Sequence, residues 1–178
     1  DKFMENNRRT KMTKLLLKTA LFEILKTKDV SKVSIKELCE EADINRTTFY
    51  LHYTQPEDVL HEAEEDALND LMEDLSRLSP NISTKEFLIE FFRKIRLEKE
   101  TYKTLFSQTG DNLFVNGLKE GILNSGTVLI KKTEFPDYFS EFILTGNLAL
   151  IKKWLDESCN IPEDKMANLI YEINHRIV

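Results

Sequence analysis

Residues 33–53 read VSIKELCEEADINRTTFYLHY, and the first third of this stretch predicts the start of a short helix. Ser34 and Glu37 have the spacing of a capping box, in which the serine accepts the amide of residue 37 and the glutamate reaches back to the serine amide. Val33 and Leu38 flank the box as a hydrophobic staple. The pattern therefore predicts a helix at about 35–42.

The rest of the stretch repeats this pattern. Asp43 interrupts the first helix, Asn45 is placed to cap a second one, and Ile44 and Phe49 form its staple. A second helix is expected at about 46–53. Two short helices joined by three or four residues have the arrangement of a helix-turn-helix, although a coincidental helical hairpin has the same spacing.

The charge distribution favours a polyanionic partner for this part of the chain. The 178 residues carry a formal net charge of −6, but residues 6–36 hold nine Lys or Arg against two acidic residues. Residues 56–178 carry a net charge of −9. A basic segment on an acidic body is typical of a nucleic-acid-binding head, and a solvated helix face is the alternative explanation.

Outside residues 33–53, apolar residues recur at helical spacing, and the chain has only five glycines and four prolines. Further helices are expected at about 7–27, 56–78, 85–98, 101–108, 112–132, 137–158 and 162–178. The predicted fold is all-α with about nine helices. A three-helix N-terminal domain is expected at 8–55 and a larger C-terminal domain at 56–178.

Several other classes of protein are disfavoured. Cys39 and Cys159 lie far apart with no CxxC, which excludes a disulfide scaffold or zinc finger. His61, Glu62 and Glu65 lack the second histidine of a zinc motif, and no nucleophile elbow or phosphate loop is present. We expect no enzyme activity, metal or cofactor. Short apolar runs and a charged N-terminal segment predict neither a membrane span nor a signal sequence, and therefore a cytoplasmic protein.

The second helix of a helix-turn-helix enters the major groove of DNA, where its N-terminal residues meet base edges. Threonine hydroxyls and methyls read bases, and tyrosine or histidine reaches phosphates. Basic residues of the first helix neutralise further phosphates. The candidate DNA-binding residues are Arg8, Arg9, Lys11, Ser34, Lys36, Asn45, Arg46, Thr47, Thr48, Tyr50, Leu51, His52 and Tyr53.

Residues 33–53 resemble the DNA-binding signature of TetR-type (TetR/AcrR) transcriptional regulators. The shared pattern is a capped helix, an alanine before the turn, a capped recognition helix and a Tyr-x-His-aromatic ending, here Tyr50 to Tyr53. The likeness covers about 9–62 closely. It extends loosely to residues 142–157 and to Pro162 and Glu163.

This resemblance implies a homodimer that binds double-stranded operator DNA and a small effector. In that family the last two helices pair with those of a partner, and helix 137–158 needs cover on two sides because it is apolar over most of its circumference. The residues assigned to this interface are Phe142, Ile143, Leu150, Trp154, Leu169, Ile170 and Ile173.

Two residues depart from the family pattern. Asp43 stands where many members have glycine in the turn, and aspartate tolerates the left-handed conformation. Pro56 stands where many have lysine at the start of the fourth helix, which removes a phosphate contact that the helix amides could partly replace.

Aromatic residues from consecutive helices of the C-terminal domain are candidates for an effector pocket, with plain core packing as the alternative. They are Phe87, Phe91, Phe92, Tyr102, Phe106 and Phe114. The sequence thus predicts a dimeric repressor that responds to an apolar or amphipathic ligand. The alternatives are a related regulator without a small-molecule ligand, an activator, and a helical interaction or carrier protein.

Overall fold

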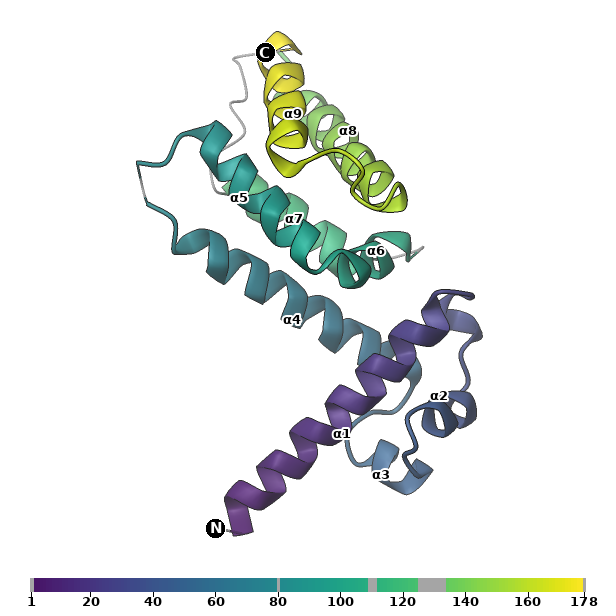
Figure 1. Cartoon of the computed structure of the whole chain (residues 1–178). Helices are drawn as coiled ribbons and strands as arrows, with labels where there is room; N and C mark the ends of the chain where they lie inside the picture. The colour runs from purple at the N-terminus through teal and green to yellow at the C-terminus, as the bar shows by residue number, and fades with distance from the viewer. Residues whose placement is uncertain (1, 80, 109–111, 125–133, 178) are drawn as a thin grey trace. The chain divides into compact units, whose positions relative to one another are not determined.

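The computed structural model describes residues 2–79, 81–108, 112–124 and 134–177 (Figure 1). Within these ranges all regular structure is helical, which confirms the all-α prediction. The helices are α1 (Lys2–Leu25), the 3-10 turn η1 (Val30–Lys32), α2 (Ile35–Glu41), α3 (Arg46–Tyr50), α4 (Pro56–Ser76), α5 (Thr84–Leu97), α6 (Lys99–Ser107), α7 (Leu113–Asn124), α8 (Pro136–Asp156) and α9 (Glu163–Ile177). Residues 125–132 of the predicted helix 112–132 lie outside the described part.

The chain divides into two compact units. The N-terminal unit comprises Asp1–Ala67 and Gln108–Leu113, and the C-terminal unit comprises Leu68–Ser107 and Phe114–Val178. The division falls inside α4, so this helix contributes residues to both units. The functional boundary between residues 55 and 56 stays a prediction.

In the N-terminal unit, α2 packs against α1 and α3 packs against α2 (Figure 1). Leu17 and Leu21 of α1, Leu38 of α2 and Phe49 of α3 are fully buried. The short helices α2 and α3, which would not be stable alone, are therefore held against the longer α1 by one shared apolar core.

The two predicted helix caps are present. The Ser34 hydroxyl accepts the Glu37 amide at 3.2 Å, and the Asn45 side chain accepts the Thr48 amide at 2.7 Å. The predicted return contact from Glu37 is not formed, because its carboxylate binds the Lys28 ammonium instead. The capping box is thus half complete. The Glu37 carboxylate instead connects α2 to the loop before η1 through Lys28.

Asp43 adopts the left-handed conformation that the turn requires, with φ 53°. The Ile44 amide meanwhile donates to the Cys39 carbonyl at 2.9 Å and closes the end of α2. Aspartate at this position therefore supports the turn that glycine would form without strain.

The N-terminus of α4 is capped by one of its own acidic residues. The Asp58 carboxylate accepts the amides of Thr54 at 2.7 Å and Gln55 at 3.1 Å. Hydrogen bonds from Thr54 are the main reason that the pKa of Asp58 is lowered. Asp58 thus engages the amides of the two residues that precede Pro56, and a phosphate contact from the first-turn amides of α4 stays a prediction.

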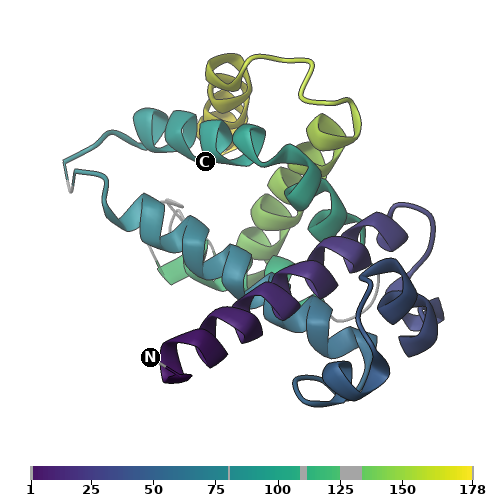
Figure 2. The ribbon, with the colours of Figure 1, turned by 60° about the horizontal axis from the view of Figure 1, so that its bottom comes forward.

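In the C-terminal unit, α5 packs against α9 and α6 packs against α8 (Figure 2). Phe92 of α5 meets Trp154 of α8 edge to face, with ring centroids 5.3 Å apart. The Trp154 indole also donates to the Ile161 carbonyl at 2.8 Å, which pins the α8–α9 loop to the core. An ion pair of 2.8 Å joins Arg96 of α5 to Glu163 of α9.

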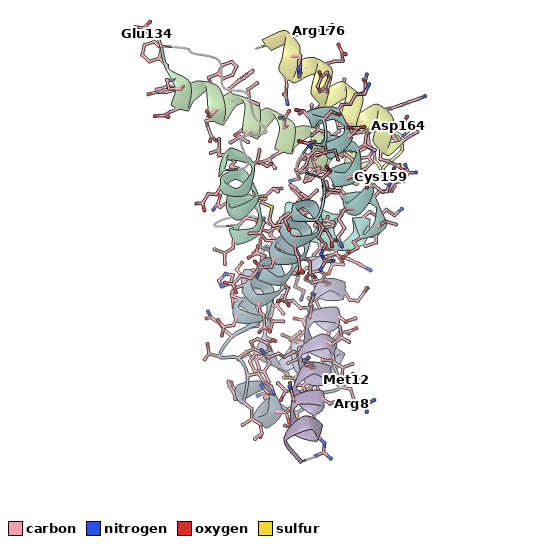
Figure 3. All side chains as sticks on the ribbon, turned by 90° about the vertical axis from the view of Figure 1, so that its left-hand side faces the viewer. Arg8, Met12, Glu134, Cys159, Asp164 and Arg176 are labelled. Atoms are coloured by element: carbon pink, nitrogen blue, oxygen red, sulfur yellow. The ribbon has the colours of Figure 1, made fainter. Side chains whose placement is uncertain are left out.

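Two further details concern the start of α5 and the loop after α8. Ser83 caps α5 and forms a complete capping box with Glu86. Cys159 is buried in the loop after α8 (Figure 3). Burial raises the pKa of both the Cys159 thiol and the Cys39 thiol, so both behave as small apolar residues.

Glycines allow α7 to approach the second half of α4 closely. A Cβ atom at Gly117 would come within 2.2 Å of Leu68, and one at Gly121 within 1.7 Å of Met72. Leu68 and Met72 are spaced by one helical turn, as are the two glycines, so each apolar side chain fills the space over one glycine.

Among the described residues, no helix is both long enough and apolar enough to cross a membrane.

Candidate functional site

One face of α3 and the residue after this helix form an exposed surface. Arg46, Thr47 and Tyr50 are exposed, Tyr50 to 59%, and Leu51 is exposed to 74%. Phe49 points the opposite way and is fully buried. The exposed tyrosine ring and leucine side chain at the end of this five-residue helix indicate a surface that binds a partner.

The other predicted DNA-binding residues surround this surface or support it. Ser34, Lys36 and Asn45 are exposed, with Ser34 and Asn45 engaged as caps, while Thr48 and His52 are half-buried. On α1, Arg8, Arg9 and Lys11 are exposed, and Arg8 is labelled near the start of this helix in Figure 3. The structure thus keeps most of the predicted residues available to a partner.

Tyr53 is different, since it is only 7% exposed and belongs to the core. Its hydroxyl interacts with the Glu62 carboxylate of α4, and the Lys14 ammonium lies 5.5 Å from its ring centre. Burial first, and then Glu62, raise the pKa of Tyr53. Tyr53 therefore positions the end of the helix-turn-helix and does not offer a surface to DNA.

Glu62 joins α1 to α4 within the N-terminal unit. The Lys14 ammonium donates to both of its carboxylate oxygens, at 2.8 and 3.0 Å. Partial burial opposes ionisation, but the hydrogen bonds from Lys14 and Tyr53 outweigh it and lower the pKa of Glu62. No group of three or more His, Cys, Asp or Glu residues is placed to hold a metal ion in the described ranges, His61 and Glu65 included.

The C-terminal unit contains an apolar cavity of about 260 Å³. Its wall comes from the second half of α4 and from α5, α7, α8 and α9. The lining residues are Met72, Leu75, Ser76, Thr84, Phe87, Leu88, Phe91, Phe92, Leu118, Gly121, Ile122, Leu144, Asn147, Leu148, Ile151, Ile170 and Asn174. The cavity is formed by segments far apart in the sequence that converge on α5.

Half of the predicted pocket aromatics line this cavity. Phe87, Phe91 and Phe92 lie in its wall. Tyr102 and Phe106 instead pack around Phe114, with ring centroids 5.6 and 5.4 Å from it. These three rings are buried and fill one another's space, so they form solid core outside the cavity wall.

The polar residues of the cavity were missed by the sequence analysis. Asn147 of α8 and Asn174 of α9 face it, together with Ser76 and Thr84. Asn174 follows Ile170 by one turn and interrupts an apolar stripe of α9. This interruption was the one feature of the sequence that could have indicated a polar residue in a cavity. That stripe was assigned to a dimer interface, which hid the role of its polar member.

The residues predicted for the dimer interface fall into two groups. Ile143, Trp154 and Ile170 are buried within the single chain, so they have no free surface for a partner. Phe142 is 65% exposed and Leu169 is also exposed, while Leu150 and Ile173 are half-buried. Tyr138, one turn before Phe142, is exposed as well and extends the apolar face of α8. The available face is therefore narrower than predicted and begins earlier on α8.

Sequence comparison identifies the C-terminal unit. Residues 82–176 match the TetR_C_8 family model, described as a transcriptional regulator C-terminal region. The matched segment contains most of the cavity wall and covers more than half of the chain. The chain belongs to the TetR family of transcriptional regulators. No curated protein sequence matches it.

Solved structures show the same fold over nearly the whole chain. A TetR transcriptional regulator from Streptococcus agalactiae 2603V has a TM-score of 0.72 at 21% identity, covering 96% of this chain and 98% of its own. The fatty acid degradation regulator FadR from Bacillus halodurans has a TM-score of 0.65 at 12% identity, covering 91% and 94%. These similarities establish a TetR-type fold.

A third similar structure was solved with a bound ligand. Thermus thermophilus FadR, a TetR family transcriptional repressor in complex with lauroyl-CoA, has a TM-score of 0.54 at 16% identity, covering 90% of this chain and 92% of its own. At this identity the similarity concerns the fold alone.

Proposed function

We propose that this TetR-family regulator is a homodimeric repressor that binds operator DNA through α3. The observation that carries the proposal is the exposed surface of Arg46, Thr47, Tyr50 and Leu51 on a helix whose N-terminus is capped by Asn45. A guanidinium, a hydroxyl, a phenol and an apolar side chain together supply contacts to base edges, thymine methyls and phosphates.

The charge of the first helix supports the same partner. Arg8, Arg9 and Lys11 are exposed on α1, in a segment with a strong excess of basic residues. Each ammonium or guanidinium that meets a phosphate releases a counterion, so operator affinity should fall steeply as salt rises. Residues 56–178, with their net charge of −9, would be repelled by DNA, which favours binding through residues 1–55, whose net charge is +3.

A second copy of the chain is the proposed partner of α8 and α9. Tyr138 and Phe142 expose two aromatic rings on one face of α8, and Leu169 is exposed on α9. Aromatic residues that are exposed in one chain and buried between two are typical anchors of a two-fold interface. Such a dimer would present two α3 helices to the two halves of a near-palindromic operator.

The cavity of the C-terminal unit is the proposed effector site. A similarly folded repressor has been solved with lauroyl-CoA, which supports a ligand-responsive role without defining the ligand here. An effector can release DNA only if it binds the DNA-free conformation more tightly than the DNA-bound one. Because Met72 and Leu75 of α4 line the cavity, a ligand would contact the same helix that begins at the helix-turn-helix.

The test is selection of bound duplexes from a random DNA pool by the full-length protein, followed by affinity measurements at two salt concentrations. An enriched inverted repeat with strong salt dependence supports the proposal. Tyr50→Ala and Arg46→Ala should each weaken operator binding by about 1–3 kcal/mol, whereas Lys85→Ala on α5 should leave it unchanged. Unselective binding would contradict the proposal, and the cavity would then favour a helical carrier protein.

A further inference from the structure

The cavity has no charged side chain among the described residues that line it. Its wall is made of aliphatic and aromatic groups with two amides and two hydroxyls. Moving an isolated carboxylate, phosphate or ammonium into such surroundings costs several kcal/mol or more, and no residue of opposite charge offsets that cost here. The wall therefore selects against a ligand that buries a charge in it.

One polar atom of the wall lacks a partner. The side-chain oxygen of Asn174 is buried and accepts no hydrogen bond within the described structure. A buried acceptor left unpaired is destabilising, and a ligand that donates a hydrogen bond to it recovers that cost on binding. Asn147, from the facing helix α8, adds a second amide to the wall.

The volume limits the size of the ligand. A cavity of about 260 Å³ exceeds the roughly 150 Å³ engineered cavity that holds benzene, and it falls below the range of about 300–1,000 Å³ usual for drug-sized ligands. A substituted aromatic ring or a chain of similar bulk fits this range. Met72, whose flexible side chain lies over Gly121, gives the wall some ability to adapt.

We propose that the effector is a small uncharged molecule, mostly apolar, whose hydroxyl or amide group donates a hydrogen bond to the side-chain oxygen of Asn174. This inference rests on the proposed ligand-responsive function, and it specifies the ligand class of the same cavity. The apolar body of the ligand contacts Phe87, Phe91 and Phe92. Asn174 is the specificity-determining residue, because it separates donors from otherwise similar molecules without one.

The experiment compares three compounds of nearly equal shape by isothermal titration calorimetry on the full-length protein. They are 4-propylphenol, its methyl ether and 4-propylbenzoate. The phenol should bind most tightly. The ether, in which a methyl group replaces the donor hydrogen, should bind about tenfold more weakly, which corresponds to about 1.4 kcal/mol. The benzoate should bind at least as weakly as the ether, because its charge has no partner in the wall.

Asn174→Leu keeps a side chain of similar size and removes the acceptor. In this variant the phenol and the ether should bind equally, whereas Asn69→Leu, at an exposed position of α4, should retain the tenfold preference. If N174L fails to fold, the ranking of the three compounds on the unchanged protein still decides the matter.

Equal binding of phenol and ether, or tighter binding of the benzoate, would overturn the proposed ligand class. Absence of binding by all three would overturn the cavity as their site. Neither result depends on DNA, so the duplex selection tests the proposed function separately. If the protein binds an operator selectively but does not distinguish the three compounds, the proposed regulator function is supported and the proposed ligand class is refuted.

Discussion

The helix-turn-helix and the cavity of the C-terminal unit depend on interactions of different range. In the N-terminal unit, the caps at Ser34 and Asn45 and the turn at Asp43 involve residues at most five positions apart. In the C-terminal unit, the cavity gathers residues from Met72 to Asn174. Local hydrogen bonds therefore set the turn and the helix starts of the helix-turn-helix, whereas the cavity forms only when distant segments pack together. This difference agrees with the proposed division of roles, in which one part binds DNA and the other binds an effector.

The largest expected effect comes from the core of the N-terminal unit. Phe49→Ala should lower the free energy of unfolding by about 3–5 kcal/mol, because the fully buried ring leaves a cavity that the caps hold open. Phe87→Ala, at the half-buried cavity wall of the other unit, should cost markedly less. Urea denaturation followed by circular dichroism measures both. Equal losses would show that the two units do not differ in packing as described.

The next effect concerns the surface of the C-terminal unit. Phe142→Ala should weaken self-association by roughly 2 kcal/mol, about 30-fold, since a largely exposed ring is the expected anchor of the dimer. Analytical ultracentrifugation over a concentration series gives the dissociation constant. The thermal stability of the separated chain should hardly change. Lys152→Ala, also at an exposed position of α8, is the matched control. A 30-fold loss of self-association affinity in this variant would show that Phe142 is not a specific anchor of the dimer.

A smaller effect tests the local origin of α3. Asn45→Ala removes the acceptor of the Thr48 amide and should destabilise the N-terminal unit by about 1 kcal/mol. Asn45→Asp restores an acceptor and should recover most of the loss. Hydrogen exchange of the α3 amides, measured by NMR, localises the change. Protection that is unaltered in N45A would mean that tertiary packing alone maintains the helix.

The smallest effect concerns the ion pair that joins α1 to α4. The pKa of Glu62 is lowered in the folded state, so its pairing adds stability above the unfolded pKa, and that stability is lost as the pH falls through the folded pKa. Glu62→Gln should therefore cost up to about 1 kcal/mol at pH 7 and very little near pH 3, with the partial exposure of the pair keeping the value low.

Urea denaturation at the two pH values measures this difference. Glu41→Gln, at an exposed position of α2, is the control and should change the stability little at either pH. A loss in E62Q that is the same at pH 3 and pH 7 would show that Glu62 acts through packing and not through its charge.

The range of the interactions also explains how much could be predicted from the sequence. The caps, the turn and the all-α fold were predictable, because Ser34, Asn45 and Asp43 act on neighbours in the chain. Tyr53 was misplaced because its partner, Glu62, lies on the next helix and no local pattern identifies that contact. Ile143, Trp154 and Ile170 were assigned to a partner surface because helix 137–158 and helix 162–178 bury more than one face.

The cavity shows the same limit. Phe87, Phe91 and Phe92 share α5 and could be grouped by spacing alone. Separating them from Tyr102, Phe106 and Phe114 required the packing of α6 against α8 and of α7 beside them. The position of Asn174 in the cavity wall could not be predicted for a related reason. Whether a polar residue on an apolar stripe faces a cavity depends on the other helices that pack around it.

Trp154 is the only tryptophan of the chain, and it belongs to the C-terminal unit, where its indole packs against Phe92 in the cavity wall. The tryptophan fluorescence of the unlabelled protein therefore reports on the C-terminal unit and hardly at all on the N-terminal unit. A shift of the emission maximum marks events beside the cavity, and melting of the helix-turn-helix leaves the signal in place. The protein thus contains its own optical probe, positioned at the site where an effector would arrive.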